Sequence, residues 1–392
     1  MHADGFRAIA VWWKDVSDHT GEFEPVDETG LVLCGYIAFL DPPKDSAFEA
    51  IRLMRAHGVQ VKVLTGDNDA VSRKICRDVG LDVGRVLLGR EIAAMPDAEL
   101  AKVVEEATLF AKLAPDQKVR VIQALHARGC VVGFLGDGIN DGPALKAADV
   151  GVSVDTAVDV ARESADIIML EKSLLVLDEG VTEGRKVFGN IMKYLKMGSS
   201  SNFGNMLSVA GASAFLPFLP MAPVQILLNN LLYDVSQTAV STDEVDEEYT
   251  ARPRKWDIGS IGRYMLCIGP ISSLFDYVTY FTLLYAFDAW SDAALFQTGW
   301  FVESLLSQTL VVHVIRTGRL PFAESRASAP LIVTTVGICV VGAWLPFSPF
   351  APALGFTPLP AEYFAALAAI LAGYLLLTQA VKAWLIRRFG LG

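Results

Sequence analysis

Long apolar runs fill the second half of the sequence and limit the folds available to it. Residues 1–190 mix charged and apolar positions, whereas apolar stretches dominate from about Gly198 onward and only short polar segments separate them. A helix that crosses a bilayer needs about 20 mostly apolar residues. We therefore expect six transmembrane helices, at about 199–217, 221–240, 264–287, 295–315, 329–347 and 362–385.

The basic residues between these runs predict an orientation. Positive charges gather on cytoplasmic loops. The segments 241–263 and 316–328 together contain seven arginines and lysines, and the three opposite loops contain none. We expect the first half of the chain and both its ends to face the cytoplasm. The net charge of −11 offers little attraction to a phosphate backbone, so no nucleic-acid partner is expected.

The first half alternates apolar runs with helical segments that stop at glycines. The runs at 31–40, 59–66 and 130–136 are typical of buried strands. Shorter strands are expected near 86–88 and at 109–113, 150–154 and 166–170. This alternation predicts a doubly wound α/β domain with a parallel sheet covered on both faces. Ligands bind such sheets at the carboxyl ends of the strands.

The string GFLGDGINDGPALKAADVGVSV, residues 133–154, is the strongest candidate site. A strand ends in Gly136-Asp137-Gly138, a tight turn holds Asn140 and Asp141, and a helix follows. Two carboxylates four residues apart beside flexible glycines suit Mg²⁺, which prefers oxygen ligands. Such a metal neutralises phosphoryl oxygens during transfer. The alternative is a set of ordinary turn residues.

Three shorter motifs also follow predicted strands. In VKVLTGDN the Thr65 hydroxyl and the Gly66 N–H can hold a phosphoryl group, although a simple helix cap explains the motif equally well. In KLAPDQK the early helical Lys118 can balance phosphate charge, or it is a solvated lysine. In FLDPPKDS, Asp41 ends a strand, and a plain strand terminator is the alternative.

Taken in order, DPPK, TGDN, KLAPDQK and GDGINDGPALKAADVG, followed by a long helix into membrane spans, resemble the second half of a P-type ATPase with its haloacid-dehalogenase-like phosphotransferase domain. The resemblance implies ATP and Mg²⁺ as cofactors, with Asp137 as the Mg²⁺ ligand supported by Asn140 and Asp141. It further implies that Thr65, Gly66 and Asp67 form the phosphoryl and nucleotide site with Lys118, and that Asp41 lies near the nucleotide. The implied domains are a nucleotide-domain remnant at 1–24, a phosphorylation-type domain at 25–190 and a membrane domain at 191–392.

The sequence departs from that family in several respects. We expect it to lack the actuator domain that carries a dephosphorylating Thr-Gly-Glu, most of the nucleotide-binding domain and the first group of spans, and it also lacks the nucleophile. Such pumps phosphorylate an aspartate in an Asp-Lys-Thr-Gly-Thr string, and this sequence contains no such string. A covalent phosphoenzyme needs a nucleophile, so we expect the chain not to complete the cycle alone. Three interpretations stay open: part of a pump that a separate chain completes, a non-catalytic truncated or split remnant, and a tethered phosphatase, which the missing nucleophile opposes.

Polar residues inside the predicted spans indicate the cargo, since ionisable groups there are functional candidates. Asn202 and Asn205 lie three apart on the first span, and Asp234 lies on the second. Asp276 and Glu303 are further acids, each with a helix–helix hydrogen bond as its alternative role. The strings NNLLYDVSQTAVSTDEVDEE and GWFVESLLSQTLVVHVIRTGRLPF resemble the magnesium-importing branch, which implies transported Mg²⁺ and a bacterial inner membrane. Ca²⁺ suits the same ligands.

Overall fold

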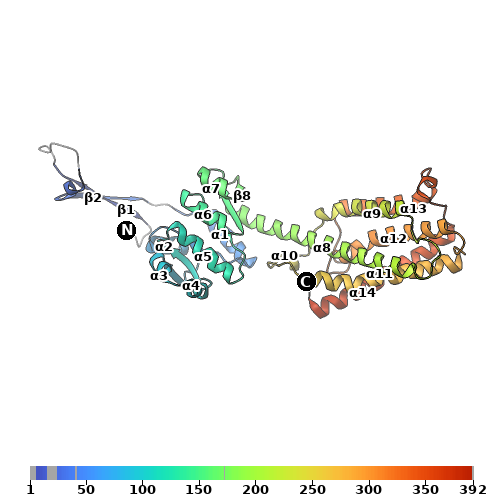
Figure 1. Ribbon diagram of the computed structural model, residues 1–392. Coiled ribbons are helices and arrows are strands. Elements are labelled where there is room, and N and C mark those ends of the chain that lie inside the picture. The colour runs from blue at the N-terminus through green and yellow to red at the C-terminus, as the bar shows by residue number, and fades with distance from the viewer. Residues whose placement is uncertain (1–5, 16–23, 40–41, 172, 391–392) are drawn as a thin grey trace. The chain divides into compact units, whose positions relative to one another are not determined.

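The computed structural model describes the chain from Phe6 to Gly390, except for residues 16–23, 40–41 and 172 (Figure 1). The chain falls into two compact units, residues 1–181 and 182–392. Helix α8 (Leu175–Ala212) starts in the first unit and continues into the second. The covalent connection between the units is therefore helical.

The first unit begins with an antiparallel hairpin of β1 (Arg7–Trp13) and β2 (Val32–Phe39), with the short 3₁₀ helix η2 (Pro25–Glu28) between them. Large apolar side chains on both strands are exposed, and Ile9 and Trp12 have 59% and 51% of their surface in solvent. Our prediction of 31–40 as a buried strand of a parallel sheet is wrong. An apolar run does not reveal its partner, and β2 pairs with the equally apolar β1.

The remainder of this unit alternates helices and strands, as expected. Its elements are α1 (Ser46–Ala56), β3 (Val63–Leu64), α2 (Asp69–Asp78), β4 (Arg85–Leu88), α3 (Gly89–Ala94), α4 (Asp97–Val103), β5 (Ala107–Ala111), α5 (Pro115–Ala127), β6 (Gly133–Leu135), η3 (Ile139–Asp141), α6 (Gly142–Ala147), β7 (Val150–Val154), α7 (Asp159–Ser164) and β8 (Ile167–Met169). All the strand pairs among β3 to β8 are parallel. Leu109, Phe110 and Ala111 on β5 are fully buried, which agrees with a strand covered on both faces.

These strands form two three-stranded sheets, of order β3-β5-β4 and β6-β7-β8, where we expected one continuous sheet. In the described part of the chain, no ladder joins β3 to β6, so each is an edge strand. On β6, Phe134 is buried, while Leu135 keeps 41% of its surface exposed. The apolar residues of the edge strand β6 are therefore only partly buried.

The second unit is helical. It contains most of α8, followed by α9 (Pro223–Gln237), η4 (Thr238–Thr242), α10 (Glu247–Thr250), α11 (Ile258–Ala286), α12 (Ala293–Ile315), α13 (Ala329–Trp344), η5 (Leu345–Phe347), η6 (Pro352–Leu354) and α14 (Ala361–Phe389). By length and composition, three described helical segments can cross a membrane: α11, α13 together with η5, and α14. Of the other three expected spans, 295–315 lies entirely within α12, whereas 199–217 and 221–240 are helical in part. Helix α9 has only 15 residues, and several of them are polar.

Small residues and a buried central helix hold this unit together. A Cβ on Gly204 of α8 would lie 2.8 Å from the Gly269 carbonyl oxygen of α11, so only glycine permits this approach. Helix α12 is buried along most of its length. Lys382 of α14 is fully buried, and its Nζ donates to the carbonyl oxygens of Val314, Thr317 and Arg319 at 2.9–3.1 Å. It thereby satisfies the Val314 carbonyl in the last turn of α12, which has no partner within the helix, and two carbonyls in the segment that follows.

Candidate functional site

The loop after β6 holds the three polar side chains of the strongest motif. Asp137 and Asn140 are exposed, whereas Asp141 is half-buried at the end of η3. A Cβ on Gly136 would lie 2.6 Å from the Cβ of Asp141, closer than side chains pack. Glycine at this position therefore lets Asp141 fold back against the strand end.

Lys118 of α5 reaches this loop from a different motif. Its side chain is buried, and its Nζ lies 2.7 Å from Oδ1 of Asp141. The other carboxylate oxygen of Asp141 accepts the N–H of Gly138 at 3.1 Å. A buried ammonium with a carboxylate partner is a strong charge-assisted contact. The structure thus brings Lys118 and Asp141 together.

The loop after β3 is fixed by its own backbone and by β5. The Thr65 N–H donates to the Phe110 carbonyl at 2.9 Å, and the Thr65 hydroxyl accepts the N–H of Asp67 at 3.0 Å. The cap of α2 is Asn68, whose side chain accepts the Ala70 N–H. Thr65 is therefore not the helix cap, and its hydroxyl proton is not used in that bond. Gly66 is exposed beside it.

The oxygen donors of the β6 loop fit a magnesium ion that keeps waters and phosphoryl oxygens among its ligands. Asp137 offers an exposed carboxylate at the carboxyl end of a parallel strand. In the described ranges, no group of three or more His, Cys, Asp or Glu side chains lies close enough to hold a metal alone. Asp41, the fourth motif's candidate, lies outside the described residues.

The candidate cation ligands of the second unit differ in their exposure. Asn202 of α8 and Asp234 of α9 are exposed, and Asn205 is half-buried. The Asn205 side-chain oxygen lies 3.5 Å from the Gln308 amide nitrogen of α12. One face of α8 and α9 therefore presents polar groups outward.

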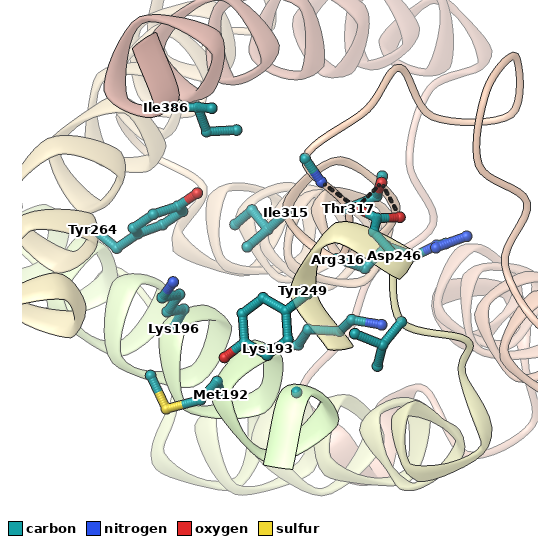
Figure 2. Close-up of a pocket in the computed structure, with 13 residues that line it drawn as sticks. Met192, Lys193, Lys196, Asp246, Tyr249, Tyr264, Ile315, Arg316, Thr317 and Ile386 are labelled. Carbon is teal, nitrogen blue, oxygen red and sulfur yellow. Dashed lines mark hydrogen bonds between the residues drawn. The ribbon is translucent and has the colours of Figure 1, made fainter. Parts of the chain in front are cut away.

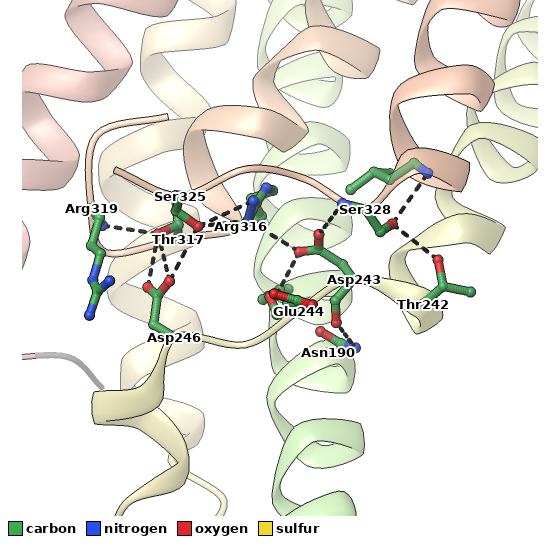
Figure 3. Close-up of polar contacts among 12 residues, drawn as sticks. Asn190, Thr242, Asp243, Glu244, Asp246, Arg316, Thr317, Arg319, Ser325 and Ser328 are labelled. Atoms are coloured by element: carbon green, nitrogen blue, oxygen red, sulfur yellow. Dashed lines mark hydrogen bonds and ion pairs between the residues drawn. The ribbon is translucent and has the colours of Figure 1, made fainter. Parts of the chain in front are cut away.

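A buried charge cluster that sequence reasoning missed centres on Asp243, in the segment after η4 (Figure 3). The Asp243 carboxylate is completely buried and lies 2.7 Å from Lys193 Nζ and 3.4 Å from Arg316 Nη1. It also accepts the N–H of Ser328 at 3.1 Å, at the start of α13. One carboxylate thus ties α8, α12 and α13 together. The only signal in the sequence is the acidic run TDEVDEE, which is typical of a solvated loop.

A small cavity of about 60 Å³ lies beside this cluster (Figure 2). Lys196, Tyr249 and Tyr264 line it, and Lys196 Nζ lies 4.7 Å from the Tyr264 ring centroid. Burial, and secondarily the charge of Arg254, lower the pKa of Lys196 to about 8. The cavity is therefore basic and aromatic, with a lysine that loses its charge more easily than an exposed one.

Comparison with known families supports both halves of this description. Residues 5–149 match the haloacid dehalogenase-like hydrolase family, and residues 218–384 match the family described as cation transporting ATPase, C-terminus.

Individual relatives agree with these matches. A magnesium-transporting ATPase, P-type 1, from Escherichia coli K12 is 53% identical over all 392 residues of this chain, and a protein of the same name from Salmonella typhimurium LT2 is equally similar. An endoplasmic reticulum calcium ATPase from Aspergillus fumigatus is 34% identical over 61% of the chain. The chain spans 44% of the length of the two magnesium-transporting relatives.

Proposed function

Because this chain belongs to the P-type ATPases and matches the carboxy-terminal part of the magnesium-transporting branch, we propose that it is part of an ATP-driven Mg²⁺ transporter. The observation that carries the proposal is the 53% identity along the entire chain, which covers both the hydrolase-like unit and the helical unit. The calcium ATPases match a shorter stretch at lower identity, so Mg²⁺ is the favoured cargo.

The proposed chemistry is an aspartyl-phosphate cycle at the carboxyl ends of β3 and β6. Asp137 would hold the catalytic Mg²⁺, which would supply charge neutralisation to the transferring phosphoryl group. Lys118 brings a positive charge to the same edge through its contact with Asp141. Thr65, Gly66 and Asp67 would bind the phosphoryl group by hydroxyl and backbone N–H donors, and ATP would be the phosphoryl source.

We further propose that a segment outside these 392 residues supplies the nucleophile. The sequence contains no Asp-Lys-Thr-Gly-Thr string. The separate sheets support this proposal, because β3 and β6 are edge strands with backbone groups able to pair with an added strand. The partial exposure of Leu135 on β6 supports it as well. An additional strand there would join the sheets and place its own carboxyl end beside Asp137.

We propose the membrane arrangement from the exposed polar side chains of α8 and α9 and from the basic loops. Asn202, Asn205 and Asp234 would bind the transported cation, and an outward carboxylate such as that of Asp234 is costly in lipid. Further helices would therefore cover this face of α8 and α9. With α8, α9 and α12 counted as spans, six helices cross a bacterial inner membrane, and the basic loops place the first unit and both ends in the cytoplasm. Helix α8 would couple the two units.

Supplying the missing part tests the proposal. The chain is co-expressed with the portion of the Escherichia coli relative that precedes the matched region, and phosphoenzyme formation and Mg²⁺ uptake are measured. We expect both activities, and we expect Asp137→Asn to reduce phosphoenzyme turnover at least about 100-fold. Asp149→Asn, in the same domain but paired with His126, is the matched control. Persistent turnover in the Asp137 variant would refute its role, and no activity in any combination would favour a non-catalytic remnant.

A further inference from the structure

Two carboxyl groups meet inside the second unit, on helices other than the two that carry the candidate cation ligands. Asp276 of α11 and Glu303 of α12 are each only 1% exposed, and their side chains hydrogen-bond to each other. Asp276 also accepts the Ser208 hydroxyl of α8 at 2.5 Å and the Trp300 indole N–H at 2.8 Å. Three helices therefore converge on one acidic pair.

The described side chains that face this pair bring no positive charge to it. They are Ser208 from α8, Tyr277 and Tyr280 from α11, Trp300 and Ser307 from α12, and Tyr363 and Tyr374 from α14. The titratable ones among these are phenols, which are neutral near pH 7.

The buried basic groups of the unit are engaged elsewhere. Among the described residues, Lys193 and Arg316 contact Asp243, and Lys382 binds backbone carbonyls. Lys196 lies over the Tyr264 ring, and His313 contacts Thr335. Two adjacent carboxylates without a cation do not both ionise at low dielectric. The pair must therefore hold a proton or another cation.

Unsatisfied polar atoms at the pair point to an exchangeable occupant. The Oε2 atom of Glu303 and the hydroxyl of Tyr280 are buried and have no hydrogen-bond partner among the described residues. The Tyr280 ring packs edge-on against Trp300, with 5.1 Å between ring centroids. Buried polar groups without partners are rare in folded proteins and mark places where a ligand or a proton moves.

We propose that Asp276 and Glu303 form a proton-binding site within the membrane unit. The two donors on Asp276 favour its ionised form, so Glu303 carries the proton and donates it to Asp276. The pair then has one net negative charge. Release of the proton breaks only the O–H bond of Glu303 and leaves two carboxylates.

The position of the pair gives its proton a role in transport. Ser208, which contacts Asp276, lies three residues after Asn205 on α8, so it is on the same face of the helix about one turn away. Proton release therefore adds negative charge close to a candidate cation ligand. This allows an exchange of protons against the transported cation. The exchange rests on the proposed transport function, whereas the proton site itself does not.

Infrared difference spectroscopy on the full chain in lipid nanodiscs tests the site without any transport assay. A protonated carboxylic acid has a carbonyl stretch that a carboxylate lacks. We expect this band in the wild type at neutral pH, its loss in Glu303→Gln, and its retention in Glu362→Gln, an exposed glutamate at the start of α14. In Asp276→Asn the band should persist at a shifted frequency, because its hydrogen-bond acceptor changes.

Two results would overturn the proposal. A band of equal intensity in the wild type and in Glu303→Gln would show that Glu303 carries no proton. A band that appears in the wild type only after divalent cations are removed by a chelator would show that the pair holds a metal ion instead. If Glu303→Gln fails to fold, the pH dependence of the wild-type band decides: it must decrease as pH rises if the proton is exchangeable, and a pH-independent spectrum contradicts the site.

Discussion

Asp137 and Asp243 show how differently the two units treat a carboxylate. Asp137 stands exposed at the end of a short parallel strand, where water solvates its charge. Asp243 is completely buried and receives Lys193, Arg316 and a backbone N–H. A site that admits a ligand leaves its charge accessible, whereas a charge that ties helices together needs its partners inside the protein. Substitutions should therefore act on activity in the first unit and on stability in the second.

The largest effect is expected from Asp243→Ala. Removing this carboxylate leaves Lys193 and Arg316 buried without their shared partner, so the free energy of unfolding should fall by about 3–5 kcal/mol. Unfolding of the full chain in detergent measures this change. Glu248→Ala is the control, because its ion pair with Arg319 is exposed and should contribute little to stability. Equal effects of the two substitutions would remove the distinction between buried and exposed charge.

A smaller effect is expected from Gly136→Ala, which tests whether the packing of the β6 loop also contributes to the stability of the first unit. The new methyl group would meet Asp141, so we expect a loss of about 1–3 kcal/mol and a weaker contact between Asp141 and Lys118. Gly84→Ala is matched to it, since a Cβ at Gly84 meets nothing within 4 Å. Denaturant unfolding gives the free energy of unfolding of both variants. Equal values would show that the β6 loop accommodates the new methyl group without cost.

A further prediction concerns the pH dependence of the second unit. Folding lowers the pKa of Lys196 from 10.5 to about 8, so between these pH values the unfolded chain binds more protons than the folded one. Stability should therefore rise as pH increases from about 8 to 10.5, because the cost of a buried charged lysine disappears. In Lys196→Met this rise should be reduced, and the variant should be more stable than the wild type below pH 8. Parallel pH profiles of the thermal midpoint would contradict the assignment.

The sequence predicts the α/β unit where local pattern is sufficient. The run at 150–154 is a strand with the expected bounds, and the helices that end before Gly58 and Gly80 are present, because glycine tolerates the positive φ found at both positions. Lys118 and Asp141 lie in separate motifs, after strands of two different sheets, and the contact between them comes from the structure and not from the sequence pattern.

The remaining features depend on contacts between distant segments. The apolar run of β2 resembles a buried strand, and nothing in its pattern indicates that it pairs with β1 across a long connection. The Asp243 cluster joins Lys193 and Arg316, which are 50 and 73 residues away in the sequence. The acidic segment around Asp243 has the sequence pattern of a solvated loop. Asp243 is buried only because distant helices pack around it, which the local pattern does not indicate. Helices α9 and α12 are not among the described helices that length and composition identify as able to cross a membrane, so composition alone does not yield the six proposed spans.

The position of Lys382 also has a consequence for biosynthesis. Its helix is translated after the other helices described in this unit, so the carbonyls at the end of α12 that Lys382 binds cannot be satisfied while those earlier helices are inserted. Until α14 arrives, this end of the bundle keeps unpaired backbone acceptors, which are costly away from water. Docking of α14 therefore completes the hydrogen bonding at this end of the bundle. Before α14 docks, the three carbonyls lack the Lys382 ammonium as their partner.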